Sequence, residues 1–256
     1  MQFIFGAGEF FGVPLSDAQG NPITNPTPIR IGAMQEMSLD LSGDLKELYG
    51  QKQFALAVAR GKVKASGKFT GAQVHGAALN SLFFGTGAVA GAMKAIYTGD
   101  AASVIAGDAA PFTVTVAPPN GGTFVEDMGV LDASALPMTR VAGTPSAGQY
   151  SVSAAGVYTF ASADISPFIS YTYTYTSQSS KRISLDNVSM GMTPTFKALM
   201  QTSFRGKKAL VELSQVTSTK LGLFATKLDD FSIPSVEFSA SADDSGTTLG
   251  NIYIQE

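Results

Sequence analysis

The strongest constraint on the fold is a regular alternation of apolar and polar residues that begins shortly after Ala33. Met37, Leu39 and Leu41 occupy every second position, and polar side chains stand between them. Successive side chains of a β-strand point to opposite faces of a sheet, so this alternation is typical of a strand with one buried face. A strand is therefore expected over residues 37–42.

The same alternation returns twice before the period changes. Residues 54–58 and 63–69 predict two further strands, and the apolar residues within 43–52 predict a long connection that exposes apolar surface. Residues 77–85 have helical spacing and end at a glycine, so a short helix is expected there. The expected order is strand, connection, two strands and helix.

Composition limits the chemistry that this chain of 256 residues can perform. It contains no cysteine, which excludes disulfide bonds, thiolate metal sites and cysteine nucleophiles. Its formal net charge of −3 argues against a protein that grips nucleic acid, because such proteins usually carry a basic excess on one face. Transient passage of DNA is compatible with this charge.

The middle of the chain differs in charge from the rest. Between residues 98 and 180 there are six acidic residues and one basic residue. This asymmetry predicts an inserted β-domain at 98–176, with a main domain formed by 1–97 and 177–256. Alternating or β-branched stretches predict strands inside the insertion at 112–116, 148–152, 157–160 and 168–175.

The last part of the chain returns to short alternating segments. Strands are expected near 183–188, 195–204, 209–213, 236–240 and 252–254, with a turn at 243–246. So many strands with one helix predict an all-β sandwich or rolled barrel with one flanking α-helix. The aromatic N-terminal segment, residues 1–15, is interpreted as a short strand or a contact arm.

No pattern of catalytic or metal-binding residues is present. His75 is the only histidine, so a histidine-based metal site or catalytic triad would depend on one imidazole. The sequence contains no GxSxG, HExxH or GxxxxGK motif. We therefore expect a protein that is not an enzyme, with no catalytic residues, no cofactor and no metal. The apolar window at 78–97 is interrupted by polar residues and glycines, so no membrane span is expected.

The stretch with the connection LKELYGQKQF, the lysine-alternating strand KVKASGKF and the ending SLFFG resembles the major tail tube proteins of long-tailed, siphovirus-like bacteriophages. The resemblance covers residues 30–85 best and 181–254 less well, and does not cover 98–176. It implies a virion protein, made in the host cytoplasm, whose hexameric rings stack into a tail tube for DNA ejection. The implied partners are the protein itself, the tail terminator, the tape measure and the baseplate or tip proteins, with double-stranded DNA in transit.

The resemblance also implies roles for particular residues. Leu45, Leu48 and Tyr49 match the loop that packs on the adjacent ring in this family. Lysines stand at even-numbered positions in and directly before the 63–69 strand, so they share one face of it. We interpret this face as subunit-facing or as a polar sheet face: Lys62, Lys64 and Lys68. The polar residues of the first strand are our hypothesis for the channel face, because a conduit should not hold its cargo tightly: Glu36, Ser38 and Asp40.

Two other functions are compatible with the sequence. A carbohydrate-binding or adhesin-like β-module would use an exposed aromatic platform, for which the candidates are Tyr150, Tyr158, Tyr171, Tyr173 and Tyr175. The other alternative is a different virion component, such as a capsid or baseplate protein. Exposure or burial of the tyrosines bears directly on the first alternative.

Overall fold

The computed structural model divides the chain into two compact units. Unit 1 comprises Met1–Ala88 and Ile183–Glu256, and unit 2 comprises Val89–Arg182. The sequence predicted these boundaries near 98 and 176, because the strand over 89–97 was missed and the strand predicted over 168–175 continues to residue 182. The structure describes residues 6, 8–73, 76, 79–86, 88–99, 112–164, 166–223, 226 and 228–255.

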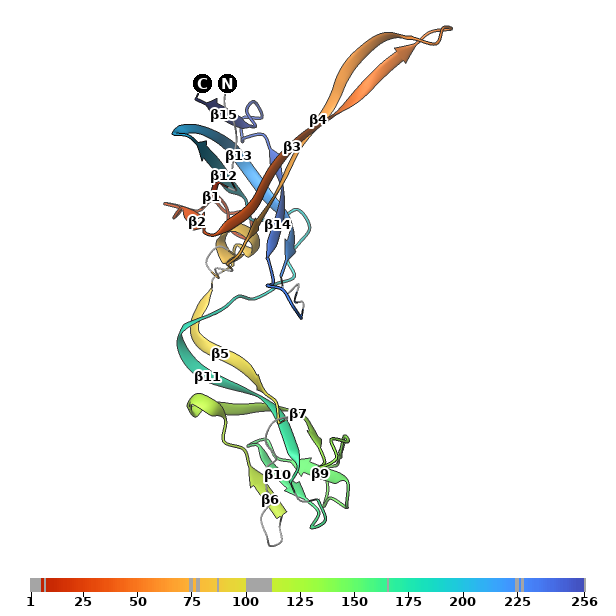
Figure 1. The fold of residues 1–256 in the computed structure, drawn as a ribbon, viewed down its shortest axis with the longest axis vertical. Coiled ribbons are helices and arrows are strands. Elements are labelled where there is room, and N and C mark those ends of the chain that lie inside the picture. The colour runs from red at the N-terminus through yellow and green to blue at the C-terminus, as the bar shows by residue number, and fades with distance from the viewer. Residues whose placement is uncertain are drawn as a thin grey trace. The chain divides into compact units, whose positions relative to one another are not determined.

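Unit 1 is built on one antiparallel sheet, which confirms the predicted all-β class (Figure 1). The sheet order is β2-β1-β12-β13-β14-β4-β3, and β15 pairs with β13 beyond the end of β14. The strands are β1 (Glu9–Pro14), β2 (Ile29–Ile31), β3 (Met34–Tyr49), β4 (Ala55–Gly71), β12 (Phe196–Phe204), β13 (Lys207–Gly222), β14 (Ser235–Ser241) and β15 (Gly250–Ile254).

This sheet rolls around its own core. Strands β2 and β3 lie at opposite ends of the sheet order, yet only residues 32–33 separate them in the chain. In addition, the rings of Phe10 on β1 and Phe69 on β4 lie 4.3 Å apart, although three strands stand between β1 and β4 in the sheet. Adjacent strands are about 4.8 Å apart, so a flat sheet would separate these rings far more widely. The sheet is therefore curled like a partly closed barrel.

Phenylalanine side chains fill the barrel. Phe10, Phe69, Phe196 and Phe238 belong to one buried cluster, in which Phe10 is fully buried. The N-terminal segment over β1 is thus an internal strand, and the interpretation of residues 1–15 as a contact arm is wrong for this part. Residues 1–5 lie outside the described part of the chain.

One end of the barrel is covered by η1 (Leu79–Phe84), a π-helical segment in place of the expected α-helix. Its hydrogen bond from the Gly85 N–H to the Asn80 carbonyl spans five residues, and Gly85 then turns with a φ of 61°. Leu82 is buried against β1, where a Cβ at Gly12 would lie 2.5 Å from the Leu82 Cδ1 atom. This close approach explains the glycine at position 12.

Unit 2 is a small sandwich of two sheets, ordered β5-β11-β7 and β6-β10-β9-β8. A single core of tyrosines and aliphatic side chains lies between them. The predicted hairpin at 148–160 and the strands near 112–116 and 168–175 are confirmed. The elements are β5 (Val89–Tyr97), β6 (Phe112–Thr115), η2 (Pro119–Gly121), β7 (Thr123–Leu131), β8 (Thr139–Arg140), β9 (Gln149–Val152), β10 (Val157–Phe160) and β11 (Phe168–Arg182).

The structure corrects two predictions in unit 1. The expected connection at 43–52 is mostly strand, because β3 continues to Tyr49 and β4 runs without interruption from Ala55, so the turn covers residues 50–54 only. The strand expected over 183–188 is absent, and this segment is irregular. Its apolar residues alternate only in part and have no neighbouring strand to pair with among the described residues.

Candidate functional site

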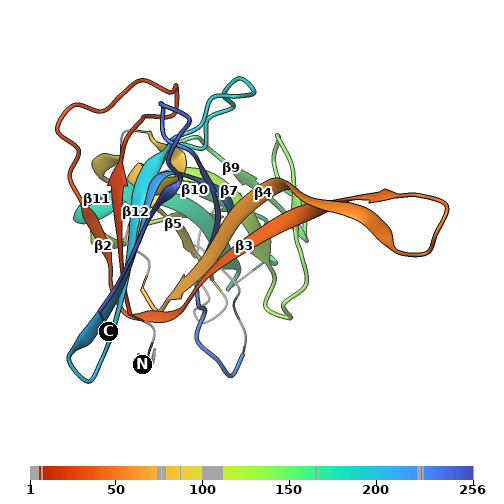
Figure 2. The ribbon, with the colours of Figure 1, turned by 90° about the horizontal axis from the view of Figure 1, so that it is seen from above.

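The outer half of the β3–β4 hairpin extends beyond the rest of its sheet. Strand β14 pairs with β4 only from Ala65 to Thr70. Beyond that point the described strands β3 and β4 pair only with each other, from Ser42 opposite Lys64 to Tyr49 opposite Ala55. We call residues 41–64 the arm, and Figure 2 shows it projecting away from the curled sheet.

The arm is apolar on both faces. Its eight large hydrophobic side chains are all at least half exposed, and Phe54 at the tip is 84% exposed. An isolated two-stranded ribbon is at best marginally stable in water, and an exposed apolar surface of this kind marks an interaction site. These side chains are Leu41, Leu45, Leu48, Tyr49, Phe54, Leu56, Val58 and Val63.

The predicted contact residues Leu45, Leu48 and Tyr49 therefore lie on a paired strand of the arm, where the sequence predicted a loop. The Tyr49 hydroxyl donates a hydrogen bond to the Glu47 carboxylate, which raises the pKa of Tyr49. Phe54 in the turn and Leu56 and other β4 residues of the arm were not among the predicted contacts. Their regular alternation was the available signal, but it was interpreted as a sheet face buried within the same chain.

The predicted channel residues and two of the lysines share one polar face of the sheet. Ser38 lies directly opposite Lys68, Asp40 opposite Ser66, and Ser42 opposite Lys64. Directly opposed residues of an antiparallel pair lie on the same face. The acidic and basic candidates thus form one surface, whereas the sequence left open whether they face different partners.

Opposite charges alternate across this polar face. The Lys68 ammonium lies 3.7 Å from the Glu36 carboxylate, and Glu237 on β14 is the direct neighbour of Lys68 on its other side. Glu237 in turn pairs with Lys220 of β13 at 3.0 Å. An open groove of about 530 Å³ follows this face and includes Asp40 and Lys64 in its lining. Lys62 stands apart, in the register shift opposite Asp44.

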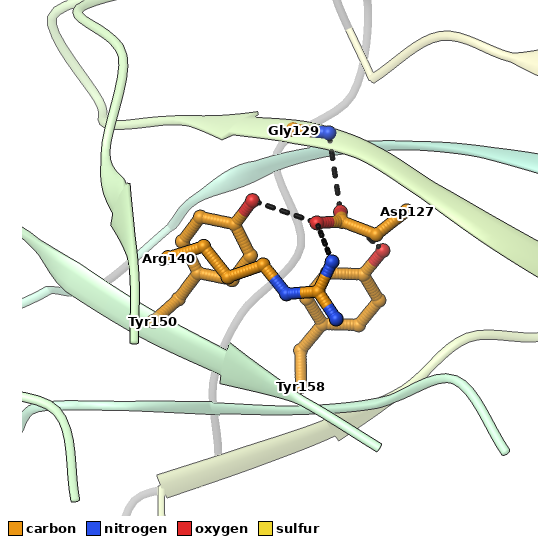
Figure 3. Close-up of polar contacts among 5 residues, drawn as sticks. All are labelled: Asp127, Gly129, Arg140, Tyr150 and Tyr158. Carbon is orange, nitrogen blue, oxygen red and sulfur yellow. Dashed lines mark hydrogen bonds and ion pairs between the residues drawn. The ribbon is translucent and has the colours of Figure 1, made fainter. Parts of the chain in front are cut away.

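Unit 2 contains a buried carboxylate that the sequence analysis did not single out (Figure 3). The side chain of Asp127 on β7 is 5% exposed, and its carboxylate accepts hydrogen bonds from the hydroxyls of Tyr150 and Tyr158, both at 2.8 Å. The Gly129 N–H donates to the same carboxylate at 3.1 Å, and the Arg140 guanidinium lies 3.8 Å away. The cluster satisfies the buried charge with three donors and one cation.

Two bulges in β7 turn Asp127 toward the core. The register against β11 skips one β7 residue at Met128 and another at Val125, and both of these side chains are exposed. A bulge adds one residue and reverses the alternation beyond it. Asp127 therefore shares the inner face with Val130, which an unbroken strand would not allow. Gly129, with a φ of 106°, provides the backbone freedom for the bend.

The tyrosines do not form an exposed platform. Tyr150, Tyr158, Tyr171 and Tyr173 are buried in the core of unit 2, and Tyr175 is half-buried against Tyr173. Burial and the bond to Asp127 both raise the pKa of Tyr150 and of Tyr158 far above the ordinary value. These phenols serve the packing of unit 2, and the surface required by the carbohydrate-binding alternative is not formed by them.

The described residues contain no group of histidine and acidic side chains arranged to hold a metal ion. His75 lies outside them. Within the same part of the chain, no helix is both long and apolar enough to cross a membrane. Comparison with protein-family models and with curated proteins gave no match to this chain.

Proposed function

We propose that this protein is a structural subunit of a phage tail tube, which polymerises into stacked rings that conduct DNA. The observation that carries the proposal is the arm, a paired ribbon with apolar side chains exposed on both faces. In a self-assembling tube, every arm has a neighbouring copy of the same chain that can bury its apolar side chains. The resemblance of residues 30–85 to tail tube proteins agrees with this interpretation.

In the proposed assembly, edge strands of neighbouring subunits pair to form the ring, and the arm joins one ring to the next. Open edges and exposed apolar ribbons invite association with other chains, and ring closure removes such edges. The polar face with Glu36, Ser38 and Asp40 is proposed to line the channel. Because Lys64 and Lys68 share this face, the lining would be of mixed charge and would hold DNA weakly.

The direct test is negative-stain microscopy of the purified, tag-free protein over a concentration series, with light scattering in parallel. Rings or tubes of uniform diameter are expected. A protein that stays monomeric at every concentration, including after addition of preformed tail tips, would contradict the proposal.

A matched pair of variants tests the role of the arm. Leu48 in the arm and Leu136 in unit 2 have nearly equal exposure, 62% and 61%. Burial of a leucine side chain contributes roughly 1.5 to 3 kcal/mol. Leu48→Ser should therefore raise the concentration needed for assembly about tenfold or more, since about 1.4 kcal/mol corresponds to a factor of ten. Leu136→Ser should leave that concentration unchanged.

A further inference from the structure

We propose that the tip of the arm binds an apolar groove at the opposite end of the barrel of a second copy. Phe54 enters this groove, and Lys52 pairs with Asp186 beside it. The inference rests on the proposed function, because it identifies the surface that receives the arm in the assembly. It concerns unit 1 alone.

The groove has a volume of about 260 Å³ and lies beside η1. One wall is η1, whose Phe83 and Phe84 rings are 5.0 Å apart. The other wall is the irregular segment 183–195, where Leu185 is 78% exposed and Met192 is also exposed. A concave apolar surface open to solvent is the kind of site that receives an aromatic anchor from a partner.

The arm tip provides such an anchor. Phe54 is the most exposed large hydrophobic residue of the arm. It lies in the same turn as Lys52, and the tip sequence from Gly50 to Arg60 has no acidic residue. An aromatic side chain beside a lysine suits an apolar groove that carries a negative charge at its edge.

The charges of the two surfaces are complementary. Among the described residues that line the groove, Asp186 is the only ionisable one. Neither Lys52 nor Asp186 has an ion-pair partner among the residues that the structure describes. Complementary charges at an interface select the partner and its orientation.

The positions of arm and groove require two copies. Strand β4 runs from the arm tip at Ala55 through the sheet to Gly71, and the chain then leads into η1. Ser218 of β13, which lines the groove, donates a hydrogen bond to the Leu82 carbonyl of η1. Arm and groove therefore lie at opposite ends of the same barrel. From Leu41 to Tyr49 the arm extends about 26 Å, at about 3.3 Å per residue, away from its own groove.

A contact between opposite ends of identical molecules is heterologous. Such a contact repeats from copy to copy and produces an open polymer when the rotation between copies does not close a ring. Exposed β15, in contrast, lies at the end of the barrel from which the arm projects, since it pairs with β13 near the β12–β13 turn. An arm bound to β15 would join two copies through the same end and would stop the growth of a tube.

Site-specific cross-linking tests the contact, because the chain contains no cysteine of its own. Full-length Phe54→Cys protein is mixed with size-tagged Leu185→Cys protein under mild oxidation. We expect the disulfide-linked heterodimer to form at least tenfold faster than with size-tagged Leu136→Cys protein, which carries its thiol at a similarly exposed leucine of unit 2. Lys52→Glu should slow the cross-link, and the added Asp186→Lys change in the other copy should restore it.

The outcomes separate this inference from the proposed function. Assembly in light scattering without a preferred Phe54–Leu185 cross-link would overturn the inference and leave the proposed function in place. Absence of both assembly and cross-link would overturn both. A preferred cross-link that the charge reversal abolishes and the double reversal restores supports the contact, because a folding defect would not be repaired by a change in the other copy.

Discussion

Replacement of Asp127 by alanine should destabilise unit 2 and leave unit 1 unchanged. The carboxylate is the acceptor for the hydroxyls of Tyr150 and Tyr158, and both phenols are almost completely buried. Alanine leaves two buried donors without a partner, and each such donor costs about 1 to 3 kcal/mol. The expected decrease in the free energy of unfolding is thus about 2 to 6 kcal/mol. In a unit of this length the Tm should fall by at least about 8 °C.

The assay follows mainly the unfolding of unit 2. Six of the eight tyrosines lie within Val89–Arg182, and the chain has no tryptophan. Near-ultraviolet circular dichroism during heating therefore reports mainly the tertiary packing of unit 2. Asp127→Asn keeps the shape and one acceptor oxygen but loses the charge, so its effect should be about half as large, as neutral hydrogen bonds are about half as strong as charge-assisted ones.

Glu126→Gln is the matched control. Glu126 precedes Asp127 on β7, carries the same charge and is exposed, and exposed substitutions usually change stability by less than about 0.5 kcal/mol. Equal Tm values for Asp127→Ala and Glu126→Gln would refute the reasoning, because the hydrogen bonds of the buried cluster would then contribute nothing measurable to the fold.

Three further predictions concern pH and packing. The raised pKa values of Tyr150 and Tyr158 mean that the folded state keeps these protons more tightly, so unit 2 should lose stability as the pH rises above about 10, with phenolate absorbance appearing together with unfolding. Gly67→Ala should destabilise unit 1 by about 1 to 3 kcal/mol in urea titrations, because its Cβ would lie 2.3 Å from the Phe238 ring. Hydrogen bonds lower the pKa of Asp243, so its turn should be ordered above an ordinary carboxyl pKa and open as the pH falls further, which amide exchange can measure.

The parts of the fold that sequence predicted well are strands with one buried face and no interruption. Phe69 and Phe238 alternate with polar neighbours, and both lie in the barrel core on strands where they were expected. The hairpin of β9 and β10 was likewise found from its flanking aromatic residues and the glycine at position 156, whose φ is 77°. In these segments the buried residues occur at every second position, as the geometry of a strand requires, so the sequence pattern is unambiguous.

In the strands that the sequence did not predict, buried residues do not occur at every second position. Strand β5 is composed largely of alanine, glycine and other small residues, and these looked like a loop. Two bulges interrupt strand β7, so its apolar residues do not stand at constant spacing. A bulge depends on the register against β11, a long-range contact that a local pattern does not contain. For the same reason the inward position of Asp127 could not be predicted.

The arm shows a different limit of sequence analysis. Alternation predicted strands correctly over 37–42, 54–58 and 63–69, although residues 43–49 were expected as a connection and belong to β3. The prediction also assumed that the apolar face would be buried by the same chain. In unit 1 the pairing of β14 with β4 ends at Ala65, while exposed apolar residues continue toward the tip as far as Phe54. The arm has the alternation that is typical of a buried strand, but no other described part of its own chain buries its apolar side chains. This combination indicates burial by another chain. The arm therefore links the stability of the fold to the proposed assembly, because an isolated ribbon gains too little from its own contacts to offset the ordering of its backbone.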